Sequence, residues 1–462
     1  MVKVFRHYIA KPFLYLALIE SLLLFASIYS GTYIHFHNSL EPAYKLYPTF
    51  SIAITFSITM VSSMIAMGLH EQHLREGMWG VFLRICGSFI IGFFIMSILF
   101  YMLPEFSLGR GTFAVSLITG FFYILTSRLI FSLAVNQDTL KRRILIVGSG
   151  KKAALINSSL RRQSDRRDFV IIGYVHFPFE HSVIKENIIP HDDTLCELAN
   201  KYAIDELVIA LDDRRNIFPM EEIVNCRLQG IDVFDLMSFF ERQTGKLPLN
   251  LIQPSWLAYS EGFYNHASRA YIKRAFDILV SLIILTASLP AIIGAAIAIR
   301  LGEKGNIFYL QERVGLNGEK FFIVKFRSMS VNAEEDGIAV WAKDNDNRIT
   351  PIGALIRKSR IDELPQIINV LKGEMSFVGP RPERPEFVGQ LSEKFPYYND
   401  RHRAKPGITG WAQVSYPYGA SEHDSAEKLQ YDLYYVKNYS LFLDLMILIK
   451  TVHVVLWGKG AR

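Results

Sequence analysis

Four apolar runs occupy the first part of the chain, at residues 12–29, 50–68, 85–103 and 113–135. Each is close to the ~20 residues that a helix needs to cross the hydrocarbon core of a bilayer. One such run alone is compatible with a buried helix of a soluble protein. Four in succession, joined by short polar loops, predict a membrane bundle of four spans.

Basic residues gather in the loops on one side of this predicted bundle, which is the side that faces the cytoplasm in most membrane proteins. The opposite loops hold little more than Lys45 and Arg110. We therefore expect both ends of the bundle to face the cytoplasm. The basic residues of the cytoplasmic side are Lys3, Arg6, Lys11, Arg75, Arg84, Lys141, Arg142 and Arg143.

Two charged residues, Glu20 and Arg128, lie inside the first and fourth runs at similar depths. An isolated charge in the bilayer costs roughly 2.5–3.5 kcal/mol on insertion scales. Two arrangements avoid that cost: the two side chains pair, or each reaches separately to the nearby interface. The sequence leaves both open.

Short apolar segments alternate with helical patterns between residues 142 and 262. Strands are expected at 143–147, 170–175, 206–210 and 231–234. Alternation of strand and helix predicts a parallel, doubly wound α/β domain.

A glycine turn, Gly148-x-Gly150, follows the first of these strands. A dinucleotide site needs a third glycine and an acidic residue after the second strand. Here Ala153 stands at the third glycine position, and the second strand continues into Tyr174 and His176 without an acid. This favours a Rossmann-like domain that performs no catalytic cofactor chemistry.

A further apolar run, residues 275–299, carries Pro290 near its centre. Proline removes a backbone donor and clashes with the preceding turn. Basic residues at both ends would lie on opposite sides of the membrane in a straight span, against the charge rule. A re-entrant helix broken at Pro290, with Ser288 capping freed groups, satisfies both facts; a kinked fifth span is the alternative. The basic flanks are Lys273, Arg274, Arg300 and Lys304.

Composition agrees with a membrane class, because 50% of the 462 residues are hydrophobic and only 20% are charged. The formal charge of +6 suits anionic headgroups or phosphate-bearing substrates. No dense basic tract indicates nucleic acid, so none is expected as a partner. The three cysteines have no CxxC spacing, which indicates neither a disulfide framework nor a zinc site.

Candidate chemistry lies in the C-terminal region. Thr350-Pro351 predicts a helix start, and a second helix is expected from Asp362 to a stop at Lys372-Gly373. Asp362 and Glu363 would then lie at a helix N-terminus, where the dipole favours carboxylates and phosphates. Nearby cations that could bind a diphosphate are Arg357, Arg360 and Arg381.

Adjacent carboxylates such as Asp362 and Glu363 can have different chemical roles. One can attack phosphorus while the other moves a proton or helps to hold a metal. Carboxylate and phosphate oxygens suit Mg²⁺. Spacing alone favours a simple helix cap with flanking salt bridges, because Asp-Glu pairs are common at helix starts.

Taken together, the C-terminal segments resemble the bacterial sugar transferases, which are polyprenyl-phosphate hexose- or N-acetylhexosamine-1-phosphate transferases. The resemblance covers about residues 271–462. The four spans and the α/β domain ahead of it resemble the long form of these initiating enzymes, and the ending at 454–462 resembles exopolysaccharide enzymes associated with exosortase systems. The matching motifs are Lys273-Arg274-x-Phe276-Asp277, Lys325-Phe326-Arg327-Ser328-Met329, Arg360-Ile361-Asp362-Glu363-Leu364-Pro365-Gln366, Phe377-Val378-Gly379-Pro380-Arg381-Pro382 and Lys405-Pro406-Gly407-Ile408-Thr409-Gly410-Trp411-Ala412-Gln413.

This resemblance implies a two-step reaction. Asp362 attacks the sugar-bearing phosphate of a UDP-sugar and releases UMP, and the covalent phosphosugar then passes to undecaprenyl phosphate. Glu363 assists, in metal binding or in proton handling. The resemblance also implies that Asp362 binds the Mg²⁺ ion that members of the family use.

The resemblance also implies substrate-binding residues. Arg381 and Arg360 hold phosphates, and Lys325 and Arg327 bind phosphate or organise the fold. Gln413 lines the pocket or supports the turn at 407–410.

The expected fold class is a membrane α-helical bundle of four spans (1–140), a Rossmann-like α/β domain (141–265) and an α/β monotopic phosphoglycosyl transferase domain (266–462) with a re-entrant membrane helix (273–300). We expect an enzyme of the bacterial inner membrane that contacts membrane lipids, carries its catalytic domain on the cytoplasmic face and initiates exopolysaccharide synthesis. The middle domain offers a surface for a homodimer. Two alternatives stay open, a NAD-dependent nucleotide-sugar-modifying enzyme and a non-enzymatic scaffold of a polysaccharide synthase, and no motif identifies the sugar.

Overall fold

The chain forms two compact units, one that runs to Thr244 and one that begins at Gly245, with residues 4–7 assigned to the second. The structure is a computed structural model. It describes residues 2–4, 7–9, 11–36, 50–67, 69, 78–104, 108–135, 141–160, 166, 169–212, 218–260, 267–302, 305–330, 348–416, 419 and 421–456. Five basic or C-terminal features named above, Arg6, Lys45, Arg75, Lys304 and the ending at 457–462, lie outside these ranges.

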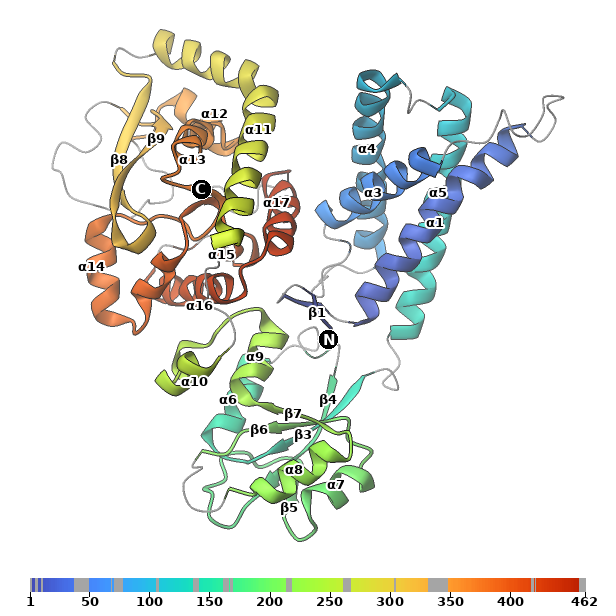
Figure 1. The fold of residues 1–462 in the computed structure, drawn as a ribbon, viewed down its shortest axis with the longest axis vertical. Helices are drawn as coiled ribbons and strands as arrows, with labels where there is room; N and C mark the ends of the chain where they lie inside the picture. The colour runs from blue at the N-terminus through green and yellow to red at the C-terminus, as the bar shows by residue number, and fades with distance from the viewer. Residues whose placement is uncertain are drawn as a thin grey trace. The chain divides into compact units, whose positions relative to one another are not determined.

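Four apolar helices follow two short strands, β1 (Val2–Val4) and β2 (His7–Ile9). Figure 1 labels the helices α1 (Lys11–Phe36), α3 (Phe50–Ala66), α4 (Met78–Met102) and α5 (Arg110–Val135). Three of them, α1, α4 and α5, are long and apolar enough to cross a membrane, whereas α3 is a shorter apolar helix of 17 residues. The predicted four apolar helices are therefore present.

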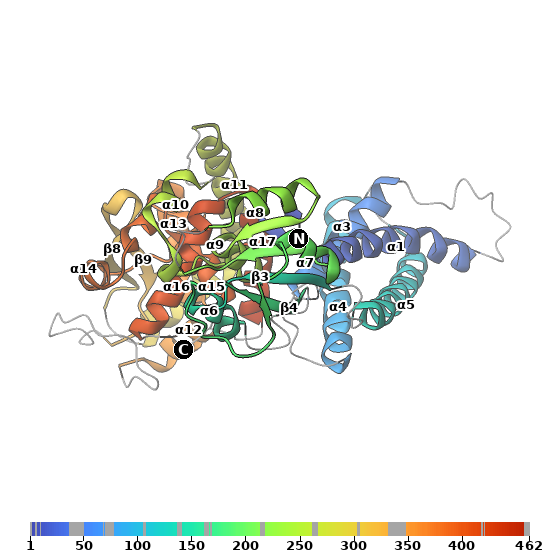
Figure 2. The same cartoon turned by 90° about the horizontal axis from the view of Figure 1, so that it is seen from below.

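Helices α1 and α5 lie side by side, as Figures 1 and 2 show. Between them, Arg128 meets Glu20 through two contacts, Nε to Oε1 at 2.6 Å and Nη2 to Oε2 at 2.9 Å. Arg128 Nη1 also donates to the Leu69 carbonyl at 2.6 Å. Both charged side chains are almost fully buried. The first of the two arrangements expected from the sequence, pairing, is confirmed.

A five-stranded parallel sheet forms the rest of the first unit, in the order β5-β4-β3-β6-β7. All four predicted strands are present, and the short edge strand β5 was not predicted. Helices α7 and α8 cover the face that carries Leu145 and Val147, while α6 and α9 lie on the other face (Figure 1). The elements are β3 (Arg142–Val147), α6 (Lys151–Ser159), β4 (Phe169–His176), β5 (Ile188–Pro190), α7 (Leu195–Lys201), β6 (Glu206–Ile209), α8 (Met220–Leu228), β7 (Asp232–Asp235) and α9 (Leu236–Thr244).

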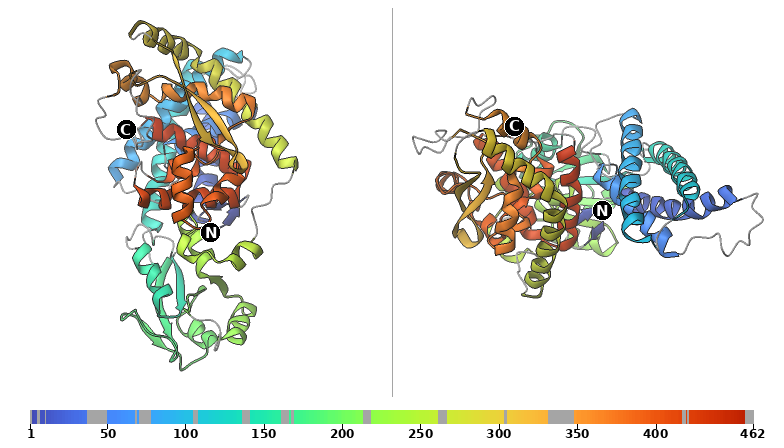
Figure 3. Two further views of the ribbon diagram at one scale, coloured as in Figure 1. Left: turned by 90° about the vertical axis from the view of Figure 1, so that its left-hand side faces the viewer. Right: turned by 90° about the horizontal axis from the view of Figure 1, so that it is seen from above.

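The second unit combines one long apolar helix with short strands and many short helices. The left panel of Figure 3 shows its antiparallel pair, β8 and β9, as a long ribbon. A second pair, β10 and β11, is parallel. The elements are η4 (Leu249–Leu251), α10 (Pro254–Tyr259), α11 (Ala267–Gly302), β8 (Phe308–Val314), η5 (Leu316–Gly318), β9 (Lys320–Phe326), α12 (Pro351–Lys358), η6 (Ile361–Gln366), α13 (Ile367–Lys372), β10 (Ser376–Val378), α14 (Pro385–Lys394), η7 (Tyr398–Arg403), β11 (Gly407–Thr409), α15 (Trp411–Ser415), α16 (Glu422–Asn438) and α17 (Leu441–Leu456).

Helix α11 is continuous through Pro290, so the expected break in secondary structure at this residue is wrong. Its axis instead bends, and Figure 1 shows two arms at a marked angle; proline is the usual cause of such a bend. Pro290 has no N–H for the carbonyl of Thr286, one turn earlier. Ser288 Oγ donates to the Ile284 carbonyl at 2.6 Å and therefore does not cap the group that Pro290 frees.

The base of α11 is fastened to the rest of its unit by the basic and acidic residues of its first turns. Lys273 Nζ lies 2.7 Å from Asp444 Oδ2, and Asp277 Oδ1 accepts hydrogen bonds from Ser376 Oγ (2.9 Å) and the Phe377 N–H (3.0 Å). Arg274 donates to two main-chain carbonyls at the end of α13. The sequence presented Lys273 and Arg274 as a basic flank and placed both, with Asp277, in a family motif, but it did not predict these contacts. They dock the helix onto β10, the strand that precedes the Gly379-to-Pro382 segment.

Candidate active site

Strand β9 presents Lys325 one residue before its end, opposite Tyr309 of β8. The strand is held against the following helices by Asn369, which is fully buried. Asn369 Oδ1 accepts from the Val324 N–H at 3.0 Å, and its Nδ2 donates to the Phe322 carbonyl at 2.7 Å. Asn369 belongs to α13, which directly follows the short helix η6 that carries Asp362 and Glu363. Its side chain therefore helps to fix the distance between Lys325 and these two carboxylates.

Helix α12 leads into those carboxylates and begins as predicted. Thr350 Oγ1 accepts from the Gly353 N–H at 2.9 Å, and Pro351 occupies the first turn. The helix ends in a sharp turn at Arg360, whose φ of +58° is a left-handed conformation that residues other than glycine rarely adopt. The next turns, η6, are of the 3₁₀ type before α13 begins, and α13 ends at Gly373 as predicted.

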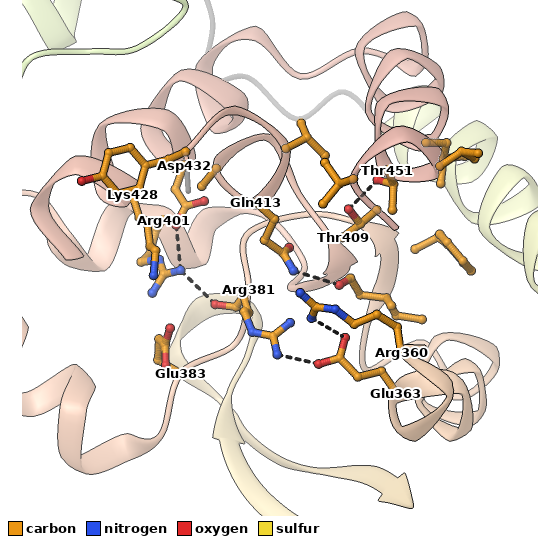
Figure 4. A pocket seen from close by; sticks show the side chains of 18 of the residues that line it. Arg360, Glu363, Arg381, Glu383, Arg401, Thr409, Gln413, Lys428, Asp432 and Thr451 are labelled. Atoms are coloured by element: carbon orange, nitrogen blue, oxygen red, sulfur yellow. Dashed lines mark hydrogen bonds and ion pairs between the residues drawn. The ribbon is translucent and has the colours of Figure 1, made fainter. Parts of the chain in front are cut away.

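Glu363, in η6, is buried and surrounded by cations (Figure 4). Its Oε1 lies 2.6 Å from Arg381 Nη2 and 3.5 Å from Lys325 Nζ, and its Oε2 lies 3.6 Å from Arg360 Nη1. Burial opposes ionisation of this carboxyl, but Arg381 and Lys325 outweigh burial and hold the pKa of Glu363 well below its usual range. Glu363 is therefore an ionised carboxylate committed to ion pairs.

Asp362 differs sharply from its neighbour. Its Oδ1 is buried and, among the residues that the structure describes, has no hydrogen-bond partner. Burial, together with the negative charge of Glu363, raises the pKa of Asp362 to about 6. Asp362 is thus ionised at neutral pH and more basic than an ordinary aspartate, as suits a nucleophile or a general base.

Lys325 is also perturbed. Burial lowers its pKa to about 8, against the opposing effect of the Glu363 carboxylate. The ammonium is still mainly charged at neutral pH. It can therefore neutralise a phosphate that approaches the carboxylates.

Arg381 reaches Glu363 from the segment that joins β10 to α14, and this segment packs backbone to backbone against the start of β11. The Gly379 N–H donates to the Thr409 carbonyl, and the Gly407 N–H donates to the Pro380 carbonyl, both at 2.9 Å. A Cβ on Gly379 would overlap the Lys405 carbonyl, and one on Gly407 would overlap the Gly379 nitrogen. Only glycine allows this approach, which brings two distant motifs of the sequence together.

A cavity of about 480 Å³ lies beside this constellation. Of the residues expected at the site, Arg360, Glu363, Arg381 and Gln413 line it. One end is polar, and the other is lined by apolar side chains of α11 and α17, including Val280, Ile284, Leu448 and Val452. A cavity with a charged end and an apolar end can accept an amphiphilic substrate.

Asp362, Lys325 and Arg327 are not among the lining residues, although Lys325 contacts Glu363. Arg327 follows β9, and its main-chain N–H donates to the Ile307 carbonyl at 2.9 Å. Gln413 both lines the cavity and donates to the Ile408 carbonyl at 3.2 Å. The two roles left open for Gln413 therefore occur together.

Several polar residues of the cavity were missed by sequence reasoning. They come from η7, α16 and the residues that follow Arg381, and Figure 4 labels four of them, Glu383, Arg401, Lys428 and Asp432. The segment Tyr398–Arg403 carries no pattern that distinguishes a buried arginine from a solvated one. The missed residues are Glu383, Tyr398, Arg401, Lys428 and Asp432.

The residues present can be compared with the needs of a magnesium ion. Among the described residues, no group of three or more His, Cys, Asp and Glu side chains could hold a metal. Asp362 Oδ1 is nevertheless a buried carboxylate oxygen without a partner. Mg²⁺ commonly binds through one or two carboxylates plus substrate phosphates and water. The site therefore fits a metal that is bound jointly with a phosphate substrate.

The glycine turn of the α/β domain is filled by the chain's own carboxylates. Glu180 Oε2 accepts from the Ser149 N–H at 2.7 Å, and Asp212 accepts from the N–H groups of Lys151 and Lys152, both at 2.8 Å. In a dinucleotide site, such N–H groups bind the pyrophosphate. The geometry therefore gives no support to a nicotinamide cofactor here.

The family model described as bacterial sugar transferase matches residues 268–458. A sugar transferase of Haemophilus influenzae, named as uncharacterized, is 30% identical over 462 residues, which cover 92% of this chain and 93% of the relative. The chain belongs to the bacterial sugar transferase family, and it is an enzyme associated with the membrane.

Two further relatives have more specific names. The UDP-N-acetylgalactosamine-undecaprenyl-phosphate N-acetylgalactosaminephosphotransferase of Aeromonas hydrophila is 42% identical over 240 residues, 52% of this chain and 56% of the relative. The undecaprenyl-phosphate galactose phosphotransferase of Salmonella typhimurium is 32% identical over 369 residues, 76% of this chain and 74% of the relative. Their names specify different sugars, so similarity alone does not identify the sugar for this chain.

Proposed function

We propose that this protein transfers a sugar-1-phosphate from a UDP-sugar to undecaprenyl phosphate and so initiates an exopolysaccharide. The observation that carries the proposal is the contrast between two adjacent carboxylates. Glu363 is held in three ion pairs, whereas Asp362 has an oxygen without a hydrogen-bond partner among the described residues, and its pKa is raised. The names of the relatives supply the class of reaction.

In the first step, a carboxylate oxygen of Asp362 attacks the phosphorus that bears the sugar. A P–O bond to Asp362 forms, the P–O bond to the other phosphate breaks, and UMP leaves with the bonding electron pair. In the second step, a phosphate oxygen of the lipid attacks the same phosphorus. The Asp362–phosphorus bond breaks, and the carboxylate is restored.

The cations around Glu363 would hold the phosphates during both steps. Arg381 and Arg360 line the cavity and can donate to phosphate oxygens in bidentate fashion. Lys325 adds a third positive charge. Because Glu363 stays ionised, its role in this proposal is to orient these cations, not to carry a proton. Mg²⁺, bound by Asp362 with the substrate phosphates, would neutralise phosphate charge.

A lipid substrate requires the site to lie at a membrane surface. The bend of α11 at Pro290 and the basic residues near both of its ends support a re-entrant helix that enters and leaves on the cytoplasmic side. In this arrangement the catalytic unit faces the cytoplasm of the bacterial inner membrane, where nucleotide sugars occur. The apolar end of the cavity, between α11 and α17, would receive the start of the prenyl chain.

The middle domain serves in this proposal as a Rossmann-like scaffold without cofactor chemistry. Its parallel sheet and glycine turn support the Rossmann-like description. The carboxylates of Glu180 and Asp212 occupy the donors of that turn and argue against a nucleotide.

The decisive experiment measures UMP release by the purified full-length protein in vesicles that contain undecaprenyl phosphate, with a panel of UDP-sugars, with and without Mg²⁺. Asp362→Asn should lower the rate by about 10³-fold or more, because the nucleophile is lost. Without lipid, the wild-type protein should gain the mass of one phosphosugar, and Asp362→Asn should not.

Asp193→Asn is a matched control, because Asp193 is a partly exposed aspartate of the other unit whose side chain pairs with Lys201 at 3.2 Å. It should retain the wild-type rate. An Asp362→Asn protein that forms the lipid product at the wild-type rate would overturn the proposal.

A further inference from the structure

Arg401 is a buried arginine that the proposed chemistry does not use. It lies in η7, is 5% exposed, and its guanidinium makes three hydrogen bonds. Nη1 donates to the Tyr398 hydroxyl at 2.9 Å, and Nη2 donates to Asp432 Oδ2 at 2.7 Å and to the main-chain carbonyl of Arg381 at 2.9 Å. The side chain thus joins three segments that are far apart in the sequence (Figure 4).

Burial of such an ion pair is a poor means of stabilising a fold. The loss of hydration of two charges often equals or exceeds their attraction, and apolar replacements can be as stable. Asp432 is 2% exposed and lies on α16, so both members of the pair have lost their water. A role in fixing geometry explains the pair better than a role in stability.

The residue held by this pair is the one that approaches Glu363. The backbone around Arg381 is restrained at three successive residues, through the Gly379 N–H, the Pro380 carbonyl and the Arg381 carbonyl. Arg401 supplies the third restraint, and Pro382 fixes the next φ angle. The direction of the Arg381 side chain, with Nη2 2.6 Å from Glu363 Oε1, follows from this restrained backbone.

We propose that Arg401 and Asp432 are positioning residues for Arg381. Asp432 orients the Arg401 guanidinium, and Arg401 holds the Arg381 carbonyl so that the Arg381 side chain points at Glu363 and at the phosphates of the substrate. This inference rests on the proposed function. It adds Arg401 and Asp432, which lie outside the carboxylate pair, to the residues that serve the proposed reaction.

Misplacement of a positioned group by about 1 Å can lower a rate by about 10²-fold. Arg401→Lys keeps the charge but cannot reach Tyr398, Asp432 and the Arg381 carbonyl in one planar geometry. It should lower kcat by about 10- to 100-fold with little change in KM, and Asp432→Asn, which keeps the shape and one acceptor oxygen, should lower kcat less.

A double-mutant cycle distinguishes positioning from general damage. UMP release is measured for the wild type, Arg401→Lys, Arg381→Lys and the double variant. If Arg401 acts through Arg381, the loss caused by Arg401→Lys should shrink to about twofold or less in the Arg381→Lys background. Losses that multiply would overturn the proposal, because they would show two independent effects.

Two further variants keep the test readable. Tyr398→Phe removes one partner of Arg401 with a minimal change in volume. If the Arg401→Lys protein does not fold, Tyr398→Phe takes its place in the cycle. A loss of activity that multiplies with the loss caused by Arg381→Lys would again overturn the proposal. Glu427→Gln is the matched control, because Glu427 lies on α16 like Asp432 but pairs with Lys246 at 2.6 Å and does not line the cavity. It should leave kcat within twofold of the wild-type value.

The Asp362→Asn protein is assayed in the same series. Activity at the wild-type rate in this variant contradicts the covalent mechanism. Multiplicative losses in the cycle, with Asp362→Asn inactive, contradict only the positioning role.

Discussion

Arg381 Nη2 lies 2.6 Å from Glu363 Oε1, and this ion pair separates the properties of two carboxylates that are adjacent in the sequence. Glu363 is stabilised in its charged form by the arginine. Its charge in turn raises the pKa of Asp362, in addition to the larger effect of burial. Glu363 is therefore an anchor for cations, and Asp362 has the properties that the proposed nucleophile needs.

Glu363→Gln should move the acid limb of the pH–rate profile to lower pH. In the wild type, kcat/KM should rise as the pH rises through about 6, because Asp362 must lose its proton before it attacks. Removal of the Glu363 charge leaves nearby cations to favour the ionised form of Asp362, so its pKa falls. UMP release measured from pH 4.5 to 9 checks the shift; Glu386→Gln, an exposed substitution on α14, should leave the limb in place. An unshifted limb in Glu363→Gln would show that another group titrates.

Lys325→Arg should remove the alkaline limb of the same profile. The pKa of Lys325 is lowered to about 8, so kcat/KM should fall as the pH rises through this value and the ammonium loses its charge. Arginine stays protonated throughout this range. Lys325→Met should lose activity at every pH. If the alkaline limb persists in Lys325→Arg, Lys325 is not the group responsible.

Asn369→Ala should destabilise the catalytic unit by about 2–3 kcal/mol, because it removes a fully buried side chain together with its hydrogen bonds to the Val324 N–H and the Phe322 carbonyl. Equilibrium unfolding in detergent, followed by near-ultraviolet circular dichroism, measures the change. Gln390→Ala, at an exposed position of α14, should stay within about 0.5 kcal/mol of the wild type. An equal stability of the two variants would show that the brace between β9 and α13 is dispensable.

Glu20→Ala and Arg128→Ala should each destabilise the helix bundle by about 3–5 kcal/mol, because each leaves the other charge buried without its partner. The double variant should lose clearly less than the sum of the two. Unfolding in mixed micelles provides the three values. Additive losses would mean that the two charges do not interact in the folded bundle.

Local chemistry predicted the helix boundaries near the site well. The cap at Thr350 and the stop at Gly373 depend on residues within one turn, and both are present. The positions of the α/β strands along the chain also follow from local apolar patterns. The bend at Pro290 was predicted as a break, because a sequence does not show that the helix continues on both sides of the proline.

Contacts between residues that are distant in the sequence could be predicted from it much less well. Arg401 and Asp432 are 31 residues apart, and neither stands in a pattern that predicts burial. Glu180 and Asp212 reach the glycine turn from 31 and 60 or more residues away, so the sequence did not show that their carboxylates accept hydrogen bonds from its N–H groups. In contrast, Glu20 and Arg128 could be named in advance as possible partners, because the bilayer leaves few partners for a charge at a given depth, although the sequence left separate contact with the interface equally open.

The attachment of α11 has a consequence for the setting of the enzyme in its bilayer. Lys273 and Asp277 tie the first turns of this helix to Asp444 and to the strand that ends at Val378, three residues before Arg381. If α11 is embedded in lipid as proposed, the immersion depth of this single helix would also set the height of the Asp362–Glu363 pair above the lipid headgroups. A bilayer of a different thickness would raise or lower the whole reaction centre relative to a phosphate whose own level is fixed by its lipid tail.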